Sequence, residues 1–277
     1  MNNSELITST QNPRIKALLQ LQEKSSQRRK QQEFVLEGRR EIMHAIERGY
    51  KVHQLYAIEN WKQELETDEF RHLKQMLEDV SMALVSRNVY ERIAYRDSTE
   101  GMVAVMGMKD HSLNSLNPFA TSNRGVHSPL YVVLESVEKP GNLGAILRSA
   151  DAAGVDAVIV CDALTDLYNP NLIRASLGGI FSVSTVSCTS SECIEFLKSH
   201  GVRILTAQLQ DSKLYYDTDM TLPTAIVMGT EATGLTEQWR EAADAHIRIP
   251  MLGILDSLNV SVSAAILMFE AVRQRGV

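Results

Sequence analysis

Three stretches in the second half of the chain place glycine, asparagine and charged side chains directly after apolar segments. The first, residues 138–148, has glycines next to a predicted helix start and Arg148 one turn inside that helix. The second, residues 229–234, sets two glycines around Glu231, and the third, residues 250–259, ends in Ser-Leu-Asn. Glycine at a helix start lets backbone N–H groups approach an anion, and arginine adds a permanent positive charge. These residue types indicate a binding site for a polar ligand such as a phosphate.

Each stretch also has a purely structural explanation. Arg148 can be a surface residue of a helix, although its apolar neighbours make a solvated position less comfortable. Glu231 can stabilise the start of the following helix, where a negative charge is favourable. The glycine spacing matches neither GxGxxG nor the P-loop. Hydride transfer with a nucleotide cofactor and NTP hydrolysis therefore gain no support.

The apolar segments around these stretches predict the elements that position them. They are continuous rather than alternating runs, separated by helix-like segments, which is typical of a parallel sheet covered on both faces. The runs assigned to strands are 130–134, 156–161, 180–186, 202–207 and 224–228. Ligands of such sheets bind beyond the carboxyl ends of the strands, where loops lead into helices. The predicted fold class is α/β, with the three stretches in loops of this kind.

The chain ends in a strand–loop–helix segment, residues 247–275. Ser257 and Asn259 suit a helix start because their side chains accept hydrogen bonds from the first free backbone N–H groups. The residues that follow are apolar on more than one face, which predicts a buried helix.

The first half predicts a smaller α/β domain of alternating strands and helices. It ends near Met108, and the polar residues 109–128, which show no periodicity, indicate a linker. A chain of 277 residues is long enough for two domains. We therefore expect domains at 1–108 and 129–277.

The net charge of −6 argues against a generally basic coat for nucleic acid. Basic residues nevertheless gather near the N-terminus and can attract phosphates. The candidates for RNA binding are Arg28, Arg29, Lys30, Arg39 and Arg40. A charge run of this kind is also compatible with a solvated helix face.

The three cysteines, Cys161, Cys188 and Cys193, lack CxxC spacing. They predict incidental thiols in a reducing compartment, with neither a metal site nor a disulfide. No apolar signal region begins the chain, and no run is long enough to span a membrane. A soluble cytoplasmic protein is expected.

Taken together, the three stretches resemble the motifs of the SpoU (TrmH) branch of the SPOUT RNA methyltransferases. They occur in the order of that family, and the resemblance covers residue 130 to the C-terminus. The matching residues are Asn142, Gly144 and Arg148; Gly229, Glu231 and Gly234; and the segments 249–251 and 257–265. The segment RASLGGIF (174–181) is also similar to a segment common in that family. The N-terminal segments ITSTQNPRIKALLQL and FVLEGRREIMHAI resemble the substrate-binding domain often fused in front of it, a ribosomal-protein-like α/β sandwich.

The resemblance implies a fold, a reaction and an assembly. The fold is a SPOUT domain with a deep trefoil knot, and the assembly is a homodimer through the C-terminal domain. The reaction is methyl transfer from S-adenosylmethionine to a ribose 2′-hydroxyl of RNA, with no metal because the sulfonium already activates the methyl group. Backbone groups of the knot loops hold the cofactor in that family. Carried over, the cofactor-binding residues are Gly229, Ile249 and Leu258, with their neighbours Thr230, Glu231, Gly234, Met251, Ser257 and Asn259.

The resemblance also assigns catalytic roles. Since a ribose hydroxyl is a poor nucleophile, deprotonation must accompany attack on the methyl group. Arg148 would assist this step; because arginine stays protonated, orienting the hydroxyl and neutralising a phosphate is the easier role. Asn142 would hold Arg148 or the ribose, Glu231 would orient the loop or the arginine, and Ser257 and Asn259 would fix the active-site loop.

Some residues depart from the pattern of that family. Lys139 stands where an acidic residue is common, and Thr230, Ala232 and Thr233 replace more usual residues of the second stretch. These positions lie beside those with assigned roles, so we expect altered loop packing rather than lost activity. Ribosomal RNA is favoured as substrate over tRNA because of the fused N-terminal domain. The alternatives are a tRNA 2′-O-methyltransferase, a non-catalytic RNA-binding or ribosome-assembly factor on the same fold, and a small-molecule enzyme of Rossmann type.

Overall fold

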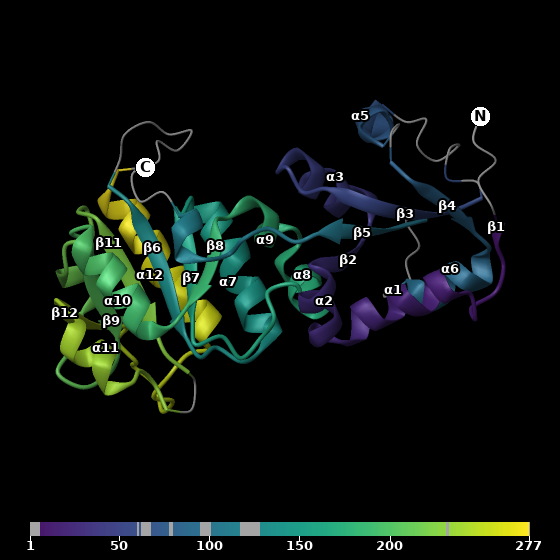
Figure 1. Ribbon diagram of the computed structural model, residues 1–277. Helices are drawn as coiled ribbons and strands as arrows, with labels where there is room; N and C mark the ends of the chain where they lie inside the picture. The colour runs from purple at the N-terminus through teal and green to yellow at the C-terminus, as the bar shows by residue number, and fades with distance from the viewer. Residues whose placement is uncertain are drawn as a thin grey trace. The chain divides into compact units, whose positions relative to one another are not determined.

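The computed structural model of the chain describes residues 6–59, 61, 68–77, 80–94, 101–116, 128–230 and 233–276. The chain divides into two compact units (Figure 1). The first comprises Met1–Lys109 with Tyr168–Ile173, and the second comprises Asp110–Leu167 with Arg174–Val277.

The first unit contains a mixed sheet with the strand order β1-β4-β3-β5-β2. Strand β5 runs antiparallel to β2 and β3, whereas β4 runs parallel to both β3 and β1. Its strands are β1 (Leu6–Ile7), β2 (Glu33–Glu37), β3 (Val52–Ile58), β4 (Met82–Val85) and β5 (Met102–Gly107).

The described helices of the first unit are α1 (Pro13–Glu23), α2 (Ser25–Gln31), α3 (Arg39–Glu47), α5 (Asp68–Met76) and α6 (Arg87–Ile93). Asn12 caps α1, with its side chain accepting from the Arg14 amide, and Pro13 lies in the first turn, which confirms the predicted helix start. Ile15, Leu18 and Leu21 of α1 are buried against the sheet with apolar residues of α6. This core fixes α1 on one face of the sheet.

Helix α2 is absent from the sequence-based prediction, because its sequence SSQRRKQ has no apolar stripe. Arg28 takes the place of an apolar anchor. Its guanidinium donates to the backbone oxygens of Leu21 and Gln22 over 2.6 and 2.9 Å, and its side chain is only 2% exposed. An arginine can therefore anchor a helix when its guanidinium donates hydrogen bonds to backbone carbonyls.

The second unit contains a seven-stranded sheet with the order β10-β12-β9-β11-β6-β7-β8. Every neighbouring pair in it is parallel, which confirms the predicted sheet. Its central strands are buried along their whole length, as their continuous apolar sequences require. The strands are β6 (Leu130–Glu135), β7 (Ala157–Cys161), β8 (Thr185–Cys188), β9 (Arg203–Ala207), β10 (Lys213–Leu214), β11 (Thr224–Met228) and β12 (Ala245–Arg248).

Helices cover both faces of this sheet. Helices α10 and α11 pack against β9 and share a core with Trp239, whereas α12 packs on α7 and contacts β6 and β11 (Figure 1, α12 in yellow). The α-helices of this unit are α7 (Pro140–Ala153), α9 (Gly179–Ser182), α10 (Ser190–Ser199), α11 (Glu237–Ala242) and α12 (Val260–Gln274). Helix α8 (Pro170–Ser176) is divided between the two units, with its residues up to Ile173 in the first. In the described ranges of the chain, no helix has the length and apolar character needed to cross a membrane.

One sequence-based expectation for this unit is wrong. The run 180–186 begins as helix α9 and becomes strand β8 only at Thr185. Gly178, with φ of 89°, starts α9, and the Ser176 hydroxyl accepts from the Ile180 amide, so the apolar residues fill a helical turn. Within the expected linker, Leu113 and Leu116 pack against the core of the second unit. Residues 117–127 lie outside the described ranges.

Helix α12 is buried on only one face. Ala264, Leu267, Met268 and Ala271 are buried, whereas Val262 and Phe269 are about half exposed. The predicted burial of α12 is therefore confirmed for one face, and the burial of the other face against a partner subunit stays a prediction. The trefoil knot implied by the family resemblance stays a prediction.

Candidate active site

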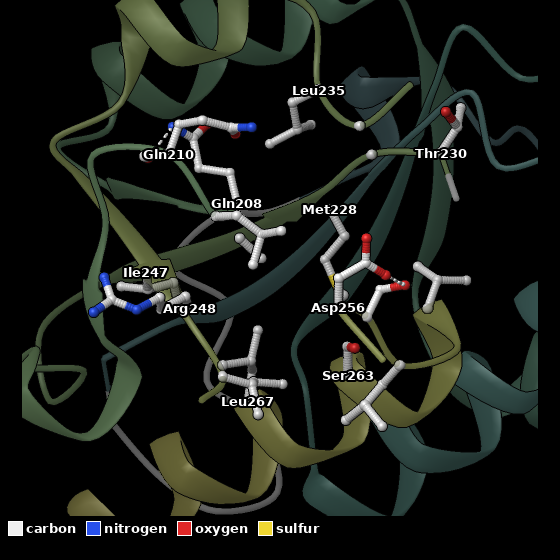
Figure 2. A pocket seen from close by; sticks show the side chains of 18 of the residues that line it. Gln208, Gln210, Met228, Thr230, Leu235, Ile247, Arg248, Asp256, Ser263 and Leu267 are labelled. Carbon is white, nitrogen blue, oxygen red and sulfur yellow. Dashed lines mark hydrogen bonds between the residues drawn. The ribbon is translucent and has the colours of Figure 1, made fainter. Parts of the chain in front are cut away.

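A pocket of about 670 Å³ opens at the carboxyl ends of three neighbouring strands, β12, β9 and β11. This is where ligands of open parallel sheets bind, and the volume suits a small organic molecule. The side chains of Gln208, Met228 and Asp256 face a common space from three different segments (Figure 2). Apolar walls come from Leu235, Ile247 and Leu267.

The pocket brings together all the described residues that the sequence analysis assigned to a cofactor. They are Gly229, Thr230, Gly234, Ile249, Met251, Ser257, Leu258 and Asn259. Glu231, assigned to both cofactor binding and catalysis, lies outside the described residues. Shared lining shows proximity, and the binding role of these residues stays a prediction.

The loop after β11 needs glycine for a steric reason. A Cβ on Gly229 would lie 2.3 Å from the carbonyl carbon and oxygen of Gly234. The loop closes through a hydrogen bond of 3.1 Å from the Gly234 amide to the Thr230 carbonyl, and Gly234 has φ of 69°. The hydroxyls of Thr230 and Thr233 lie 2.7 Å apart and tighten the turn further. These threonines, which depart from the family pattern, therefore stabilise the loop.

The loop after β12 is open on its outer side. Residues 252–259 are exposed, and Leu252 is 97% exposed. The same loop turns Asp256, Ser257 and Leu258 toward the pocket. It ends at Asn259, the N-cap of α12, whose side-chain oxygen accepts from the Ser261 amide over 2.9 Å and from its hydroxyl over 2.6 Å. The predicted cap is therefore confirmed.

Asn142 and Arg148 do not line the pocket. Both lie on the adjoining helix, α7. Helix α7 begins at Pro140, so Asn142 lies in its first turn rather than in a loop. The Asn259 side-chain amide donates to the Asn142 side-chain oxygen over 3.2 Å. Arg148 is exposed, and within the described part of the chain no side chain pairs with its guanidinium. Arg148 therefore presents an unpaired positive charge on α7, about two turns after Asn142. The hydrogen bond of Asn142 to Asn259 links this helix to the pocket.

Several pocket residues were not identified in the sequence analysis, and two of them carry unpaired polar atoms. Gln208 follows β9, and Arg240 lies in α11, and both line the pocket. The buried Oε1 atom of Gln208 and the buried Nε atom of Arg240 have no hydrogen-bond partner among the described residues. Buried polar atoms normally have a partner, so both are available to a ligand. In the sequence, Gln208 is distinguished only by its position after a buried strand and Arg240 only by its position in a helix. Many residues share these positions.

The basic residues assigned to RNA divide into two groups. Arg28 is buried and bonded to backbone oxygens, and Arg39 is only 9% exposed. The assignment of Arg28 to phosphate binding is therefore corrected: its guanidinium has a structural role. Arg29, Lys30 and Arg40 are exposed and remain candidates.

Two protein-family models together match most of the chain. Residues 129–269 match a model described as the SpoU rRNA Methylase family. Residues 12–104 match a model described as an MRM3-like substrate binding domain.

Individual proteins show the same similarity. The chain is 31% identical over 255 residues to a 23S rRNA uridine 2′-O-methyltransferase of Streptomyces viridochromogenes, covering 88% of this chain and 83% of that protein. It is 27% identical over 264 residues to a 23S rRNA guanosine 2′-O-methyltransferase of Bacillus subtilis, covering 95% and 98%. The crystal structure of an AdoMet-bound rRNA methyltransferase from Sinorhizobium meliloti superposes with a TM-score of 0.85 at 28% identity, covering 98% of each chain.

Proposed function

Because the chain belongs to the SpoU rRNA methylase family, we propose that it transfers the methyl group of S-adenosylmethionine to a ribose 2′-hydroxyl of ribosomal RNA. The observation that supports this most is the pocket at the ends of β9, β11 and β12. It gathers the second and third family motifs, and the Asn142–Asn259 hydrogen bond joins the first motif to it.

The pocket residues fit S-adenosylmethionine. A purine carries both hydrogen-bond donors and acceptors, which complement the unpaired Gln208 Oε1 and Arg240 Nε atoms. The apolar walls suit its flat faces and the methionine chain. Backbone groups of Gly229, Ile249 and Leu258 would hold the cofactor, with contacts from the neighbouring Thr230, Glu231, Gly234, Met251, Ser257 and Asn259. When bound, it supplies a methyl group that its sulfonium already activates.

The chain's own residues would prepare the nucleophile. The exposed guanidinium of Arg148 is a permanent cation that can neutralise a substrate phosphate and orient the ribose hydroxyl, whose proton must leave as the bond to carbon forms. Asn142 would position this end of α7 against the cofactor loop through Asn259. Glu231 would orient the loop or the arginine, and Ser257 would fix the loop that carries it.

The first unit would bind the RNA. Its match to an MRM3-like substrate binding domain supports this, and so do the exposed charges of Arg29, Lys30 and Arg40. The two curated relatives act on 23S rRNA, which supports ribosomal RNA rather than tRNA as the substrate. A substrate of this kind would place the protein in the cytoplasm.

Two chains would form a homodimer through the exposed side of the second unit. Val262 and Phe269 lie seven residues apart on α12, which puts them on one helix face, and both are about half exposed. The nearby loop adds the exposed side chains of Leu252, Ile254 and Leu255. These exposed apolar side chains support an interaction site on this side of the unit.

The reaction is tested with ribosomal RNA from cells that lack this protein. The purified chain, labelled S-adenosylmethionine and this RNA should yield 2′-O-methylated nucleoside at one position, detected by nuclease digestion and mass spectrometry. RNA from cells that contain the protein should accept no label because the site is already modified. Bound cofactor without label in ribosomal RNA or tRNA would overturn the proposal and favour a non-catalytic RNA-binding factor. Label in tRNA alone would overturn the choice of substrate.

A further inference from the structure

The three cysteines meet at one point in the second unit. The Sγ atoms of Cys161, Cys188 and Cys193 all lie within 4.8 Å of one another, although 32 residues of sequence separate the first from the last. Cys161 ends β7, Cys188 ends β8 and the two are paired in register, while Cys193 lies in the first half of α10. The parallel sheet therefore creates a cluster that the sequence spacing does not reveal.

The cluster is accessible from one side. Cys161 and Cys193 are buried in the apolar core, whereas Cys188 is only partly buried. All three are free thiols. Cys188 therefore offers a route by which a small ion can reach the two inner sulfurs.

Hydrogen bonds fix the residues next to the three cysteines. Thr189 and Glu192 form a capping box at the start of α10, with the Glu192 carboxylate accepting from the Thr189 amide over 2.8 Å. The Asp162 carboxylate accepts from the Ser190 hydroxyl over 2.6 Å. Residues directly beside each cysteine are thus fixed, and the two carboxylates make the surroundings of the cluster negative. Both properties favour a cation.

The separations suit thiolate coordination. With metal–sulfur bonds of about 2.3 Å, three sulfurs around one ion lie about 4 Å apart. Sulfur atoms already within 4.8 Å reach this arrangement through small side-chain rotations. Soft thiolate ligands select ions such as Zn²⁺ and Cu⁺ over Mg²⁺ and Ca²⁺.

We propose that Cys161, Cys188 and Cys193 form a binding site for a thiophilic cation, Zn²⁺ or Cu⁺. Each thiol that coordinates releases its proton to solvent, so binding strengthens as the pH rises. In the strand order, β6 separates β7 and β8 from the pocket strands, so this site is distinct from the proposed active site.

The test uses the reduced full-length chain without oxygen. Zn²⁺ and Cu⁺ are titrated separately in competition with a chromophoric chelator, and the thiols are counted with a disulfide reagent before and after metal addition. We expect one equivalent of one of these ions to bind, three thiols to be protected and the melting temperature to rise. Cys188→Ser, at the least buried position, should weaken binding by roughly 100-fold or more. Ser187→Ala, on the same strand, is the matched control and should bind as the wild type does.

Three results would overturn the site. One is the failure of both ions to compete with the chelator. Another is binding that Cys188→Ser leaves unchanged while the variant melts as the wild type does. The third is a stable disulfide formed under mild oxidation in the presence of either ion, which would show a redox pair instead. All these readouts are independent of methyl transfer, so they do not depend on the proposed function.

Discussion

The Asn259 side chain donates to Asn142 with its amide group and caps helix α12 with its oxygen. One residue therefore sets the start of α12 and ties it to the first turn of α7, 117 residues earlier in the chain. The link joins the loop that lines the pocket to the helix that carries Arg148. Substitutions at the two ends should have different consequences.

Asn142→Ala removes the link but leaves the cap. We expect slower methyl transfer with little change in cofactor affinity or melting temperature. Asn259→Ala removes both interactions, and the lost cap should cost an additional 0.5–2 kcal/mol or so of stability. Thermal unfolding, cofactor titration and single-turnover kinetics on both variants measure these effects. Equal stability of the two variants would contradict the structural role of the cap.

Arg148→Ala should abolish most methyl transfer while the cofactor still binds. Its guanidinium lies outside the pocket lining, so we expect a rate loss of about 100-fold or more and a cofactor affinity close to that of the wild type. Lys198→Ala, on the exposed side of α10, is the control for loss of a surface charge. If affinity and rate fall together, Arg148 has a structural role.

Gly229→Ala should damage the pocket itself. The new Cβ would meet the Gly234 backbone at 2.3 Å, so the loop must open. We expect the cofactor affinity to fall at least about tenfold, equivalent to about 1.4 kcal/mol. Gly253→Ala is a matched control in the next loop, because its Cβ would meet nothing within 4 Å. Calorimetric titration of both variants tests this, and similar affinities would show that the closed loop is not required.

Charge reversal at Arg29 and Lys30 should weaken RNA binding. Each lost phosphate contact should reduce the slope of log K against log salt concentration by about 0.7 to 0.9. Arg28→Met should instead lower the melting temperature, since Arg28 anchors α2 through backbone oxygens. Filter binding at several salt concentrations separates the two effects. An unchanged slope would make Arg29 and Lys30 ordinary solvated residues.

Phe269→Glu should produce monomers. A charge on the exposed face of α12 would have to be buried at the proposed subunit contact, which is costly. Light scattering should show a dimer for the wild type and for the control Leu164→Glu, whose side chain is exposed elsewhere in the second unit. A dimeric Phe269→Glu variant would place the contact on another surface.

The parallel sheet could be predicted well from the sequence because the buried strands of the sheet are continuous apolar runs. Residues 180–186 were misplaced, since an apolar run of seven residues is compatible with either a helical turn or a strand. Helix α2 was missed because the anchor of that helix is the charged Arg28, whose backbone partners are invisible in a one-dimensional pattern.

The candidate site divides in the same way. Family motifs contain the loops after β11 and β12, so the residues of both loops were found. The loop after β9 carries no such motif, and Gln208 becomes visible only when the strand order places β9 between β12 and β11. The cysteine cluster was missed for a related reason, since register pairing between β7 and β8 determines it.

The loop of residues 250–259 takes part in two proposed contacts. Its inner residues line the pocket, and its outer residues Leu252, Ile254 and Leu255 belong to the proposed subunit contact. Cofactor binding and chain association, which would both involve this loop, would be thermodynamically linked, and such linkage is reciprocal. Dilution that separates the chains would then weaken cofactor binding, and saturating cofactor would hold the chains together at lower concentration.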